Sequence, residues 1–278
     1  MVKKSVVIIS PENIEIFEVV KYFISEVNFV LVGNLKVIDK FINDTDLDKS
    51  SIEIVDIDDH EKAAKYGAQL IMNKKANVIM KGLIHTGLFM RILLKKEYNL
   101  FKEGQSLVSL VSKFDIPSYH KPLFLTDCGI NIKPNIEQKA EIVRNAIGVV
   151  KALGLENPKI ACITPVEIVN SRIQSTVDAK ILKDTFGNTI IEGPISFDLA
   201  LSKEAARIKD FISPVAGDAD VLIFPDLDTG NSVYKSLVLF GGATVCGIVS
   251  GLKVPVVLTS RADSIKTKID SLKLALSI

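Results

Sequence analysis

Short runs of β-branched and apolar residues alternate along the chain with segments of helical periodicity. Several of these runs are apolar throughout, which is typical of strands covered on both faces. Strands that alternate with helices favour a mainly parallel sheet with right-handed crossovers. The predicted fold class is therefore α/β, with mainly parallel sheets and flanking helices. The predicted strands are residues 5–10, 29–33, 52–57, 76–80, 159–164, 189–192, 220–224, 243–249 and 255–259.

The clearest helix is predicted over residues 135–153. Its apolar face is marked at steps of four and three by Ile136, Ala140, Val143, Ile147 and Val150. Asn135 is a suitable N-cap, Gln138 stands at the capping-box position, and Gly154 is suited to end the helix.

Composition limits the possible partners and the compartment. The 278 residues allow one large domain or two of ordinary size, and the formal net charge of +1 provides no overall field for nucleic acid or an anionic membrane. The longest uncharged stretch, residues 236–252, contains four glycines and is shorter than the roughly 20 apolar residues of a membrane span. Three cysteines without a CxxC pair indicate a reducing compartment. We expect a cytoplasmic protein that binds neither nucleic acid nor membrane.

One segment interrupts the alternation of strands and helices. Residues 114–122 contain two prolines and a run of polar residues, which fits either a linker or a long hairpin connection.

Polar residues collect where four of the predicted strands stop. They are residues 81–91 after strand 76–80, residues 193–198 after strand 189–192, residues 225–235 after strand 220–224, and residues 260–264 after strand 255–259. Ligands of open α/β sheets bind just beyond the carboxyl ends of strands. We therefore expect these segments to lie on neighbouring strands and to form one cleft.

Two of these segments carry groups suited to an anion. Ser260 offers a hydroxyl, Arg261 a fixed cation and Asp263 a carboxylate, and a hydroxyl beside a guanidinium suits phosphate. Gly230 lets the backbone approach a ligand, and a helix start beside it would direct free N–H groups at an anion.

These segments also have structural interpretations. Ser260 and Asp263 fit the cap-x-x-acid pattern of a helix start, in which Ser260 caps the helix and Asp263 favours its dipole. For such a pattern the structural role is the commoner outcome. Residues 229–231 fit a turn, and Lys235 fits a solvated side chain.

The histidines and cysteines give no strong signal. His60, His85 and His120 lack metal-ligand spacing, which favours structural roles. Cys128 fits a small buried thiol unless a base or cation lies beside it.

Sequence patterns of common nucleotide and hydrolase sites are missing. The chain has no GxxxxGK followed by Ser or Thr, no GxGxxG after a strand and no GxSxG. No metal-chelating cluster is visible, so no metal site is predicted. These absences weigh against simple ATPase, dehydrogenase and hydrolase functions.

Six ordered segments resemble the phosphotransacylase family, the phosphate acetyl- and butyryltransferases. They are KGLIHTGLFMR (81–91), LTDCGIN (125–131) with Pro134, Glu137 and Gln138, EGPISFD (192–198), SPVAG (213–217), FPDLDTGN (224–231) with Tyr234 and Lys235, and LTSRADS (258–264). The resemblance covers roughly residues 76–278, and several ordered motifs are far more specific than one. The ending TSRADS resembles the butyryltransferase branch more closely than the acetyltransferase branch.

The resemblance implies reversible transfer of an acyl group between coenzyme A and inorganic phosphate. Coenzyme A is then a co-substrate, acyl-CoA and phosphate are the ligands, and no cofactor is bound permanently. It further implies an isocitrate/isopropylmalate dehydrogenase-like fold of two α/β domains, with the active site in the interdomain cleft. We expect domains at residues 1–120 with 250–278 and at 121–249, the second forming a homodimer. A butyryl or branched acyl group is expected; a phosphate acetyltransferase and a noncatalytic coenzyme A-binding protein are the alternatives.

The resemblance also assigns roles to single residues. Ser260 stands where the family orients the thiol, and Arg261 where an arginine holds acyl phosphate and stabilises developing charge. Arg91 matches an arginine associated with coenzyme A binding. The residues expected to contact phosphate or to line the cleft are Thr229, Gly230, Asn231 and Lys235. Thiolate and phosphate react directly once both are positioned, so no acyl-enzyme is required.

The chain departs from the family pattern at the general base. Acetyltransferases proposed to use a base carry an aspartate seven residues after the serine, and here that position is Thr267. Asp263 is the nearest carboxylate and is a candidate base; solvent and the substrate phosphate are the alternatives.

Overall fold

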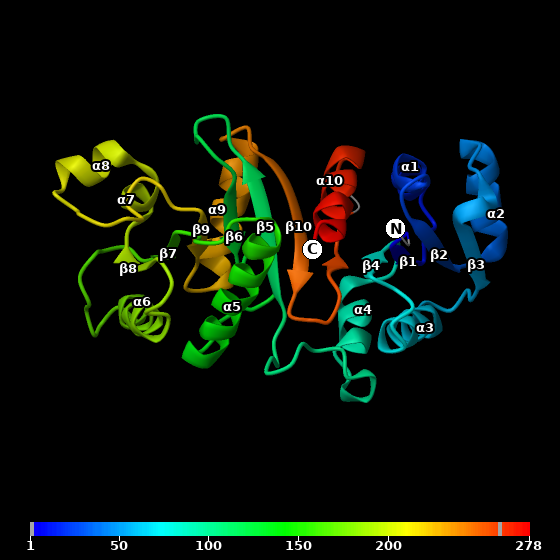
Figure 1. The fold of residues 1–278 in the computed structure, drawn as a ribbon, viewed down its shortest axis with the longest axis horizontal. Helices are drawn as coiled ribbons and strands as arrows, with labels where there is room; N and C mark the ends of the chain where they lie inside the picture. The colour runs from blue at the N-terminus through cyan, green and yellow to red at the C-terminus, as the bar shows by residue number, and fades with distance from the viewer. Residues whose placement is uncertain (1–2, 261–262) are drawn as a thin grey trace. The chain divides into compact units, whose positions relative to one another are not determined.

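The computed structural model describes residues 3–260 and 263–278 (Figure 1). The chain divides into two compact units, residues 1–105 with 246–278 and residues 106–245. The predicted domains differ from these units at residues 106–120 and 246–249. The assignment of functional domains and of a dimerisation domain stays a prediction.

The first unit is built on a parallel sheet with the strand order β3-β2-β1-β4-β11. The residues of β1 after Ser5 are wholly buried and apolar, as expected for a strand covered on both faces. The strands are β1 (Ser5–Ile9), β2 (Asn28–Gly33), β3 (Ile52–Asp56), β4 (Val78–Lys81), β10 (Thr244–Ser250) and β11 (Val256–Val257). The helices are α1 (Ile14–Phe23), α2 (Leu35–Thr45), α3 (His60–Met72), α4 (Thr86–Leu93) and α10 (Ile265–Leu276), with 3-10 turns η1 (Lys49–Ser51) and η2 (Lys96–Tyr98).

The carboxyl end of the chain returns to this first unit. Strand β11 pairs in parallel with β4, Val256 opposite Ile79, and antiparallel with β10, Val249 opposite Val256. Helix α10 then packs against α1, so the last residues of the chain lie beside its first elements (red and blue in Figure 1). The loop that carries Ser260 therefore starts at the carboxyl edge of the sheet, next to the loop that follows β4.

The second unit has the strand order β5-β6-β9-β7-β8, parallel except for the β5–β6 pair. Its core combines sheet residues that share one face, such as Leu125, Leu222 and Ile195, with Leu199 and Ala206 from the covering helices. The strands are β5 (Ser109–Asp115), β6 (Leu123–Thr126), β7 (Ile160–Ile163), β8 (Ile191–Ile195) and β9 (Val221–Ile223). The helices are α5 (Ile136–Ala152), α6 (Gln174–Thr185), α7 (Phe197–Leu201), α8 (Lys203–Ile208) and α9 (Leu227–Leu239).

The predicted helix over residues 135–153 is confirmed as α5. Asn135 accepts from the Gln138 N–H at 2.9 Å, Gln138 reaches back to the Asn135 N–H at 2.9 Å, and both halves of the capping box are present. Gly154 follows the helix with φ +90°, the left-handed geometry that glycine adopts without strain.

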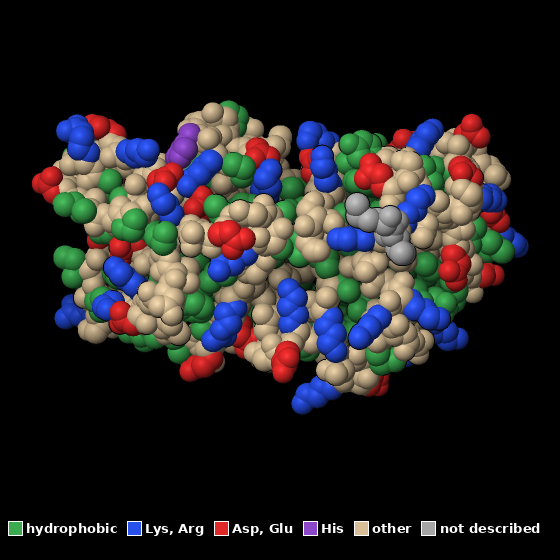
Figure 2. Space-filling model, viewed as in Figure 1, with side chains coloured by type: hydrophobic (Ala, Val, Ile, Leu, Met, Phe, Trp, Pro, Cys, Tyr) green, Lys and Arg blue, Asp and Glu red, His purple; other side chains and the backbone are tan. Residues whose placement is uncertain are grey.

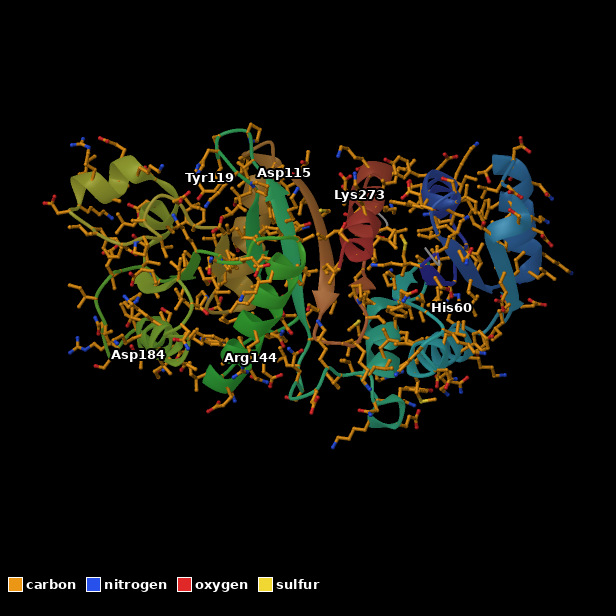
Figure 3. All side chains as sticks on the ribbon, viewed as in Figure 1. His60, Asp115, Tyr119, Arg144, Asp184 and Lys273 are labelled. Carbon is orange, nitrogen blue, oxygen red and sulfur yellow. The ribbon has the colours of Figure 1, made fainter. Side chains whose placement is uncertain are left out.

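The interrupted segment is a hairpin connection rather than a linker. It joins β5 to β6, which pair antiparallel with Ser112 opposite Leu125. Tyr119 in this connection (labelled in Figure 3) donates its hydroxyl to the Ala219 carbonyl at 2.7 Å. Neither strand was predicted from the sequence: β5 mixes Ser, Lys and Asp into its pattern, and β6 follows directly on the interrupted segment.

Candidate functional site

Three neighbouring strands of the first unit end at the same edge of its sheet. Strands β1, β4 and β11 are followed by Ser10, Gly82 and the segment from Leu258 to Ser260, respectively. The first two loops are in close contact, because the Leu83 N–H donates to the Ser10 carbonyl at 2.7 Å. A Cβ at Gly82 would lie 2.1 Å from that carbonyl oxygen, so only glycine fits there.

The other two predicted segments lie in the second unit and need two corrections. Strand β7 separates β9 from β8, so the segments that follow β9 and β8 do not come from adjacent strands. Gly193 and Pro194 lie inside β8 rather than after it, and the loop after β8 begins at Ser196. The strand was predicted to end at Glu192, whereas β8 continues through Gly193 and Pro194 to the apolar Ile195.

Two hydrogen bonds join Ser260 to Asp263. The Ser260 N–H donates to Asp263 Oδ2 at 2.6 Å, and the Asp263 N–H donates to the Ser260 carbonyl at 3.2 Å. Ser260 is exposed, while Asp263 is half-buried. The predicted Arg261 lies outside the described residues.

The interpretation of Ser260 as a helix cap is wrong. Helix α10 begins at Ile265, and its N-cap is Ser264, whose hydroxyl oxygen accepts from the Thr267 N–H at 3.1 Å. The hydroxyls of Ser264 and Thr267 also lie 3.1 Å apart. Thr267, at the position where some acetyltransferases have an aspartate, is thus the third residue of the helix and part of its cap. Ser260 is left outside the helix.

Sequence reasoning missed Lys268, which is only 2% exposed. Its ammonium donates to Glu15 Oε2 at 2.6 Å and to the backbone carbonyl of Asp263. The sequence places Lys268 one turn before Leu272 and two turns before Ala275, which puts it on the same helix face as these two apolar residues. Both residues are buried in α10. A lysine on the apolar face of a helix needs a partner, and here it has two.

Arg91 lies in the last turn of α4 and is exposed. The start of the same helix follows Lys81, which is buried and donates its ammonium to the Gly82 carbonyl at 3.0 Å and to the Ile84 carbonyl at 3.3 Å. This buried cation ties the strand end to the loop that precedes the helix. His85 occupies the N-cap position without a side-chain cap bond.

In the second unit, Asp127 organises the loop that follows β6. Its carboxylate accepts from the N–H groups of Gly129, Ile130 and Asn131 at 2.8, 3.1 and 3.1 Å, and from the Asn131 side chain at 2.5 Å. Burial raises the pKa of the Asp127 carboxyl, and these hydrogen bonds oppose that shift without cancelling it. The loop is therefore held around one buried carboxylate.

Helix α9 is packed directly onto this loop. A Cβ at Gly230 would lie 2.4 Å from the Asp127 carbonyl oxygen. The neighbouring Asn231 donates its side-chain amide to the Cys128 carbonyl at 3.0 Å, so two adjacent residues of α9 contact the loop. The two motifs TDCGIN and DTGN thus form one joined structure, and the close contact explains why glycine is needed.

The remaining predicted residues of α9 lie in different surroundings. The Thr229 N–H donates to the N-cap Asp226 at 2.8 Å, and Thr229 borders a pocket of about 900 Å³. Lys235 is exposed, with its ammonium 5.4 Å from the centre of the Tyr234 ring. The pocket is also lined by residues of α5, α6, α7, α9 and the loops after β6, β7 and β9, and they include the buried ion pair Lys139–Asp178 at 2.6 Å.

Cys128 and Cys162 have the chemistry of buried structural thiols. Burial, with a smaller contribution from Asp127, raises the pKa of Cys128, and burial raises the pKa of Cys162 to about 12. Both thiols are protonated at neutral pH and are poor nucleophiles. Among residues 3–260 and 263–278, no group of three or more His, Cys, Asp and Glu side chains is placed to hold a metal ion. His60 lies 3.3 Å from Glu12, and His120 lies 2.8 Å from Asp218.

Charged groups of both signs are interspersed on the face drawn in Figure 2. Within the described part of the chain, no helix is long and apolar enough to cross a membrane.

The α/β fold, with polar loops at the carboxyl ends of its strands, belongs to the class of proteins that bind ligands at this edge of an open sheet. The chain belongs to the family Phosphate acetyl/butaryl transferase, whose model matches residues 60–276. The predicted enzyme class, a phosphate acyltransferase, is confirmed.

Similar proteins include enzymes with both acyl preferences. A phosphate butyryltransferase of Clostridium beijerinckii is 39% identical over 251 residues, covering 88% of this chain and 82% of the relative. A phosphate acetyltransferase of Rhizobium meliloti is 40% identical over 234 residues, covering 82% of this chain and 73% of the relative. The solved structure of a branched-chain phosphotransacylase from Enterococcus faecalis V583 is 35% identical, with a TM-score of 0.86 and coverage of 99% and 98%. The predicted dehydrogenase-like α/β fold is confirmed by this and other phosphotransacylase structures.

Proposed function

We propose that the protein transfers a short butyryl or branched acyl group between coenzyme A and inorganic phosphate. The observation that carries this proposal is the likeness over nearly the whole length of both chains to a branched-chain phosphotransacylase. The butyryltransferase relative and the ending TSRADS point the same way. Phosphate acetyltransferase is the second candidate, because an acetyltransferase relative is as similar as the butyryltransferase.

The proposed reaction needs no covalent intermediate with the protein. A phosphate oxygen attacks the thioester carbonyl, the carbon–sulfur bond breaks, and the thiolate leaves and takes up a proton. In reverse, the thiolate attacks the carbonyl of acyl phosphate and phosphate leaves. Free thiols have a pKa near 8.5, so a hydrogen bond to sulfur and a fixed cation favour the reactive anion.

Residues of the Ser260 loop have the chemistry that this reaction requires. We propose that the exposed Ser260 hydroxyl donates to the sulfur and that Arg261 holds the phosphate and the developing charge on the carbonyl. Asp263 is a poor candidate for the base, because one carboxylate oxygen already accepts from the Ser260 N–H at 2.6 Å. Substrate phosphate or solvent is then the proton acceptor, and Asp263 shapes the loop.

The other predicted residues serve binding in this proposal. Arg91, exposed on α4, binds a phosphate of coenzyme A. Thr229, Asn231 and Lys235 contact phosphate or substrate from α9, where Asn231 retains its amide oxygen after donating to Cys128. Gly230 admits the close approach of helix and loop.

The decisive experiment measures release of free thiol from acyl-CoA with and without phosphate. We expect phosphate-dependent release from butyryl-, isobutyryl- and isovaleryl-CoA at a higher kcat/KM than from acetyl-CoA. One missing methylene contact is worth about 1–3 kcal/mol, and acetyl lacks two of the methylenes of butyryl, so the preference should be about 10-fold or more. Equal or higher kcat/KM for acetyl-CoA favours the acetyltransferase. Saturable binding of coenzyme A without turnover of any of the four favours a noncatalytic protein.

A matched pair of variants tests the role of Arg261. Arg261→Ala removes the proposed electrostatic stabilisation, worth on the order of 3 kcal/mol or about 100-fold in rate. Arg207→Ala is the control, because Arg207 is exposed on α8 and pairs only locally with Glu204 at 2.6 Å. Equal rates for the two variants would remove Arg261 from the mechanism.

The assembly and the compartment are further proposals. We propose a homodimer in the cytoplasm, as the family resemblance and the absence of a CxxC pair suggest. Light scattering at several protein concentrations measures the mass, and a mass of one chain throughout would contradict the dimer.

A further inference from the structure

Helix α10 buries a positive charge beneath the Ser260 loop. Lys268 stands one turn into the helix with a side chain 3% exposed. A buried ammonium is retained only where charge and hydrogen-bond partners compensate its lost hydration. Here the compensation is specific, since the same nitrogen contacts a carboxylate and a backbone carbonyl.

The two partners of Lys268 belong to separate parts of the sheet edge. Glu15 lies in the first turn of α1, which follows β1, and that turn is fixed by Asn13, whose side chain accepts from the Glu15 N–H at 2.9 Å. Asp263 ends the loop that follows β11. Lys268 therefore ties the Ser260 loop to the start of α1, 253 positions away in the sequence.

Asp263 is joined to Ser260 and to Lys268 by three hydrogen bonds. Its carboxylate accepts from the Ser260 N–H, its own N–H donates to the Ser260 carbonyl, and its carbonyl accepts from Lys268. The first two bonds join Asp263 to Ser260. The third links Asp263 to helix α10.

We infer that Lys268, backed by Glu15, is a positioning residue for the Ser260 loop in acyl transfer, a role that rests on the proposed function. Docking of α10 has other sources: Leu272 and Ala275 are buried, and the Ser271 hydroxyl oxygen accepts from the Gly247 N–H at 3.2 Å. The carboxylate of Glu15 compensates the charge of Lys268. Lys268 therefore acts on the position of Ser260 and Asp263 rather than by attracting phosphate. Misplacement of a reacting group by about 1 Å costs on the order of 100-fold in rate.

The test compares Lys268→Met with Lys273→Met. Methionine keeps the length and removes the ammonium, while Lys273 is an exposed lysine of the same helix (labelled in Figure 3). We expect Lys268→Met to lower kcat about 10-fold to 100-fold with the KM for phosphate changed less than about threefold. Hydrogen–deuterium exchange of residues 258–264 should rise in this variant and stay unchanged in Lys273→Met.

Two further variants keep the inference testable if Lys268→Met does not fold. Lys268→Arg retains a buried cation and should recover part of kcat, and Glu15→Gln, which keeps an acceptor oxygen but no charge, should lie between wild type and Lys268→Met. Wild-type kcat and unchanged exchange in Lys268→Met or Glu15→Gln would overturn the inference. A wild-type protein without phosphate-dependent thiol release would instead refute the proposed function, and the exchange data would still decide whether Lys268 holds the loop.

Discussion

Replacing Gly230 by alanine tests the contact between α9 and the Asp127 loop. The new Cβ would lie 2.4 Å from the Asp127 carbonyl oxygen and 3.2 Å from Phe224 Cδ2, whereas ordinary contacts begin at 3.4 Å. The helix or the loop must therefore shift by close to 1 Å, because a backbone carbonyl has no rotamer to adopt. Overpacking of this kind costs about 1–3 kcal/mol. A 2.4 Å approach to a backbone atom belongs in the upper part of that range, about 2–3 kcal/mol. Alanine returns about 1 kcal/mol of helix propensity, so the net loss is about 1–2 kcal/mol.

The same shift would be transmitted to the proposed site. Asn231 donates to the Cys128 carbonyl, so displacement of the helix changes both motifs together. Thermal unfolding should show a Tm lower by a few degrees, since about 1 kcal/mol corresponds to about 2–4 °C for units of 150–250 residues. The kcat/KM should fall by more than the fraction of unfolded protein accounts for, up to about 100-fold.

Gly148→Ala is the matched control. Gly148 is an exposed glycine inside α5, and nothing lies within 4 Å of the Cβ it would gain. It should raise stability by about 0.5–1 kcal/mol and leave the rate unchanged. If Gly230→Ala raises Tm as much as Gly148→Ala and keeps full activity, the close contact does not exist.

The remaining predictions concern charge and capping. Burial raises the pKa of Asp218, but hydrogen bonds from Lys159, Lys121 and His120 outweigh it, so the net pKa lies well below its usual range. A carboxyl whose pKa is depressed in the folded state stabilises the fold above its unfolded pKa and loses that contribution on acidification. Below about pH 4, the Tm of the wild type should therefore fall more steeply than the Tm of Asp218→Asn. Parallel profiles of Tm against pH would contradict this prediction. Thr267→Asp places a carboxylate at the third residue of α10, where it should stabilise the helix by about 0.3–1 kcal/mol. The pH–rate profile of Thr267→Asp shows whether a carboxylate at this position increases the rate of acyl transfer. A Tm below that of the wild type would contradict the assignment of Ser264 as the N-cap.

Local sequence patterns were sufficient for the fold class, for α5 with its capping box, and for the family. Periodicity and capping depend on residues three or four positions apart, and the ordered motifs lie within short segments. Such local patterns can be recognised without knowing which distant residues they contact in the fold. Strand β5 was not predicted because Ser112 and Lys113 interrupt its apolar pattern, and the burial of Ser112 is visible only in the folded protein.

Tertiary structure decided what the polar residues do. The sequence pattern favours Ser260 as the start of a helix, whereas the structure places the N-cap at Ser264, because α10 begins only at Ile265. Lys268 resembles any solvated lysine until Glu15 is brought to it, and Gly230 resembles a turn glycine until the Asp127 carbonyl is placed against it. These roles arise from contacts between residues far apart in the chain, and the burial that makes such contacts strong exists only in the folded protein.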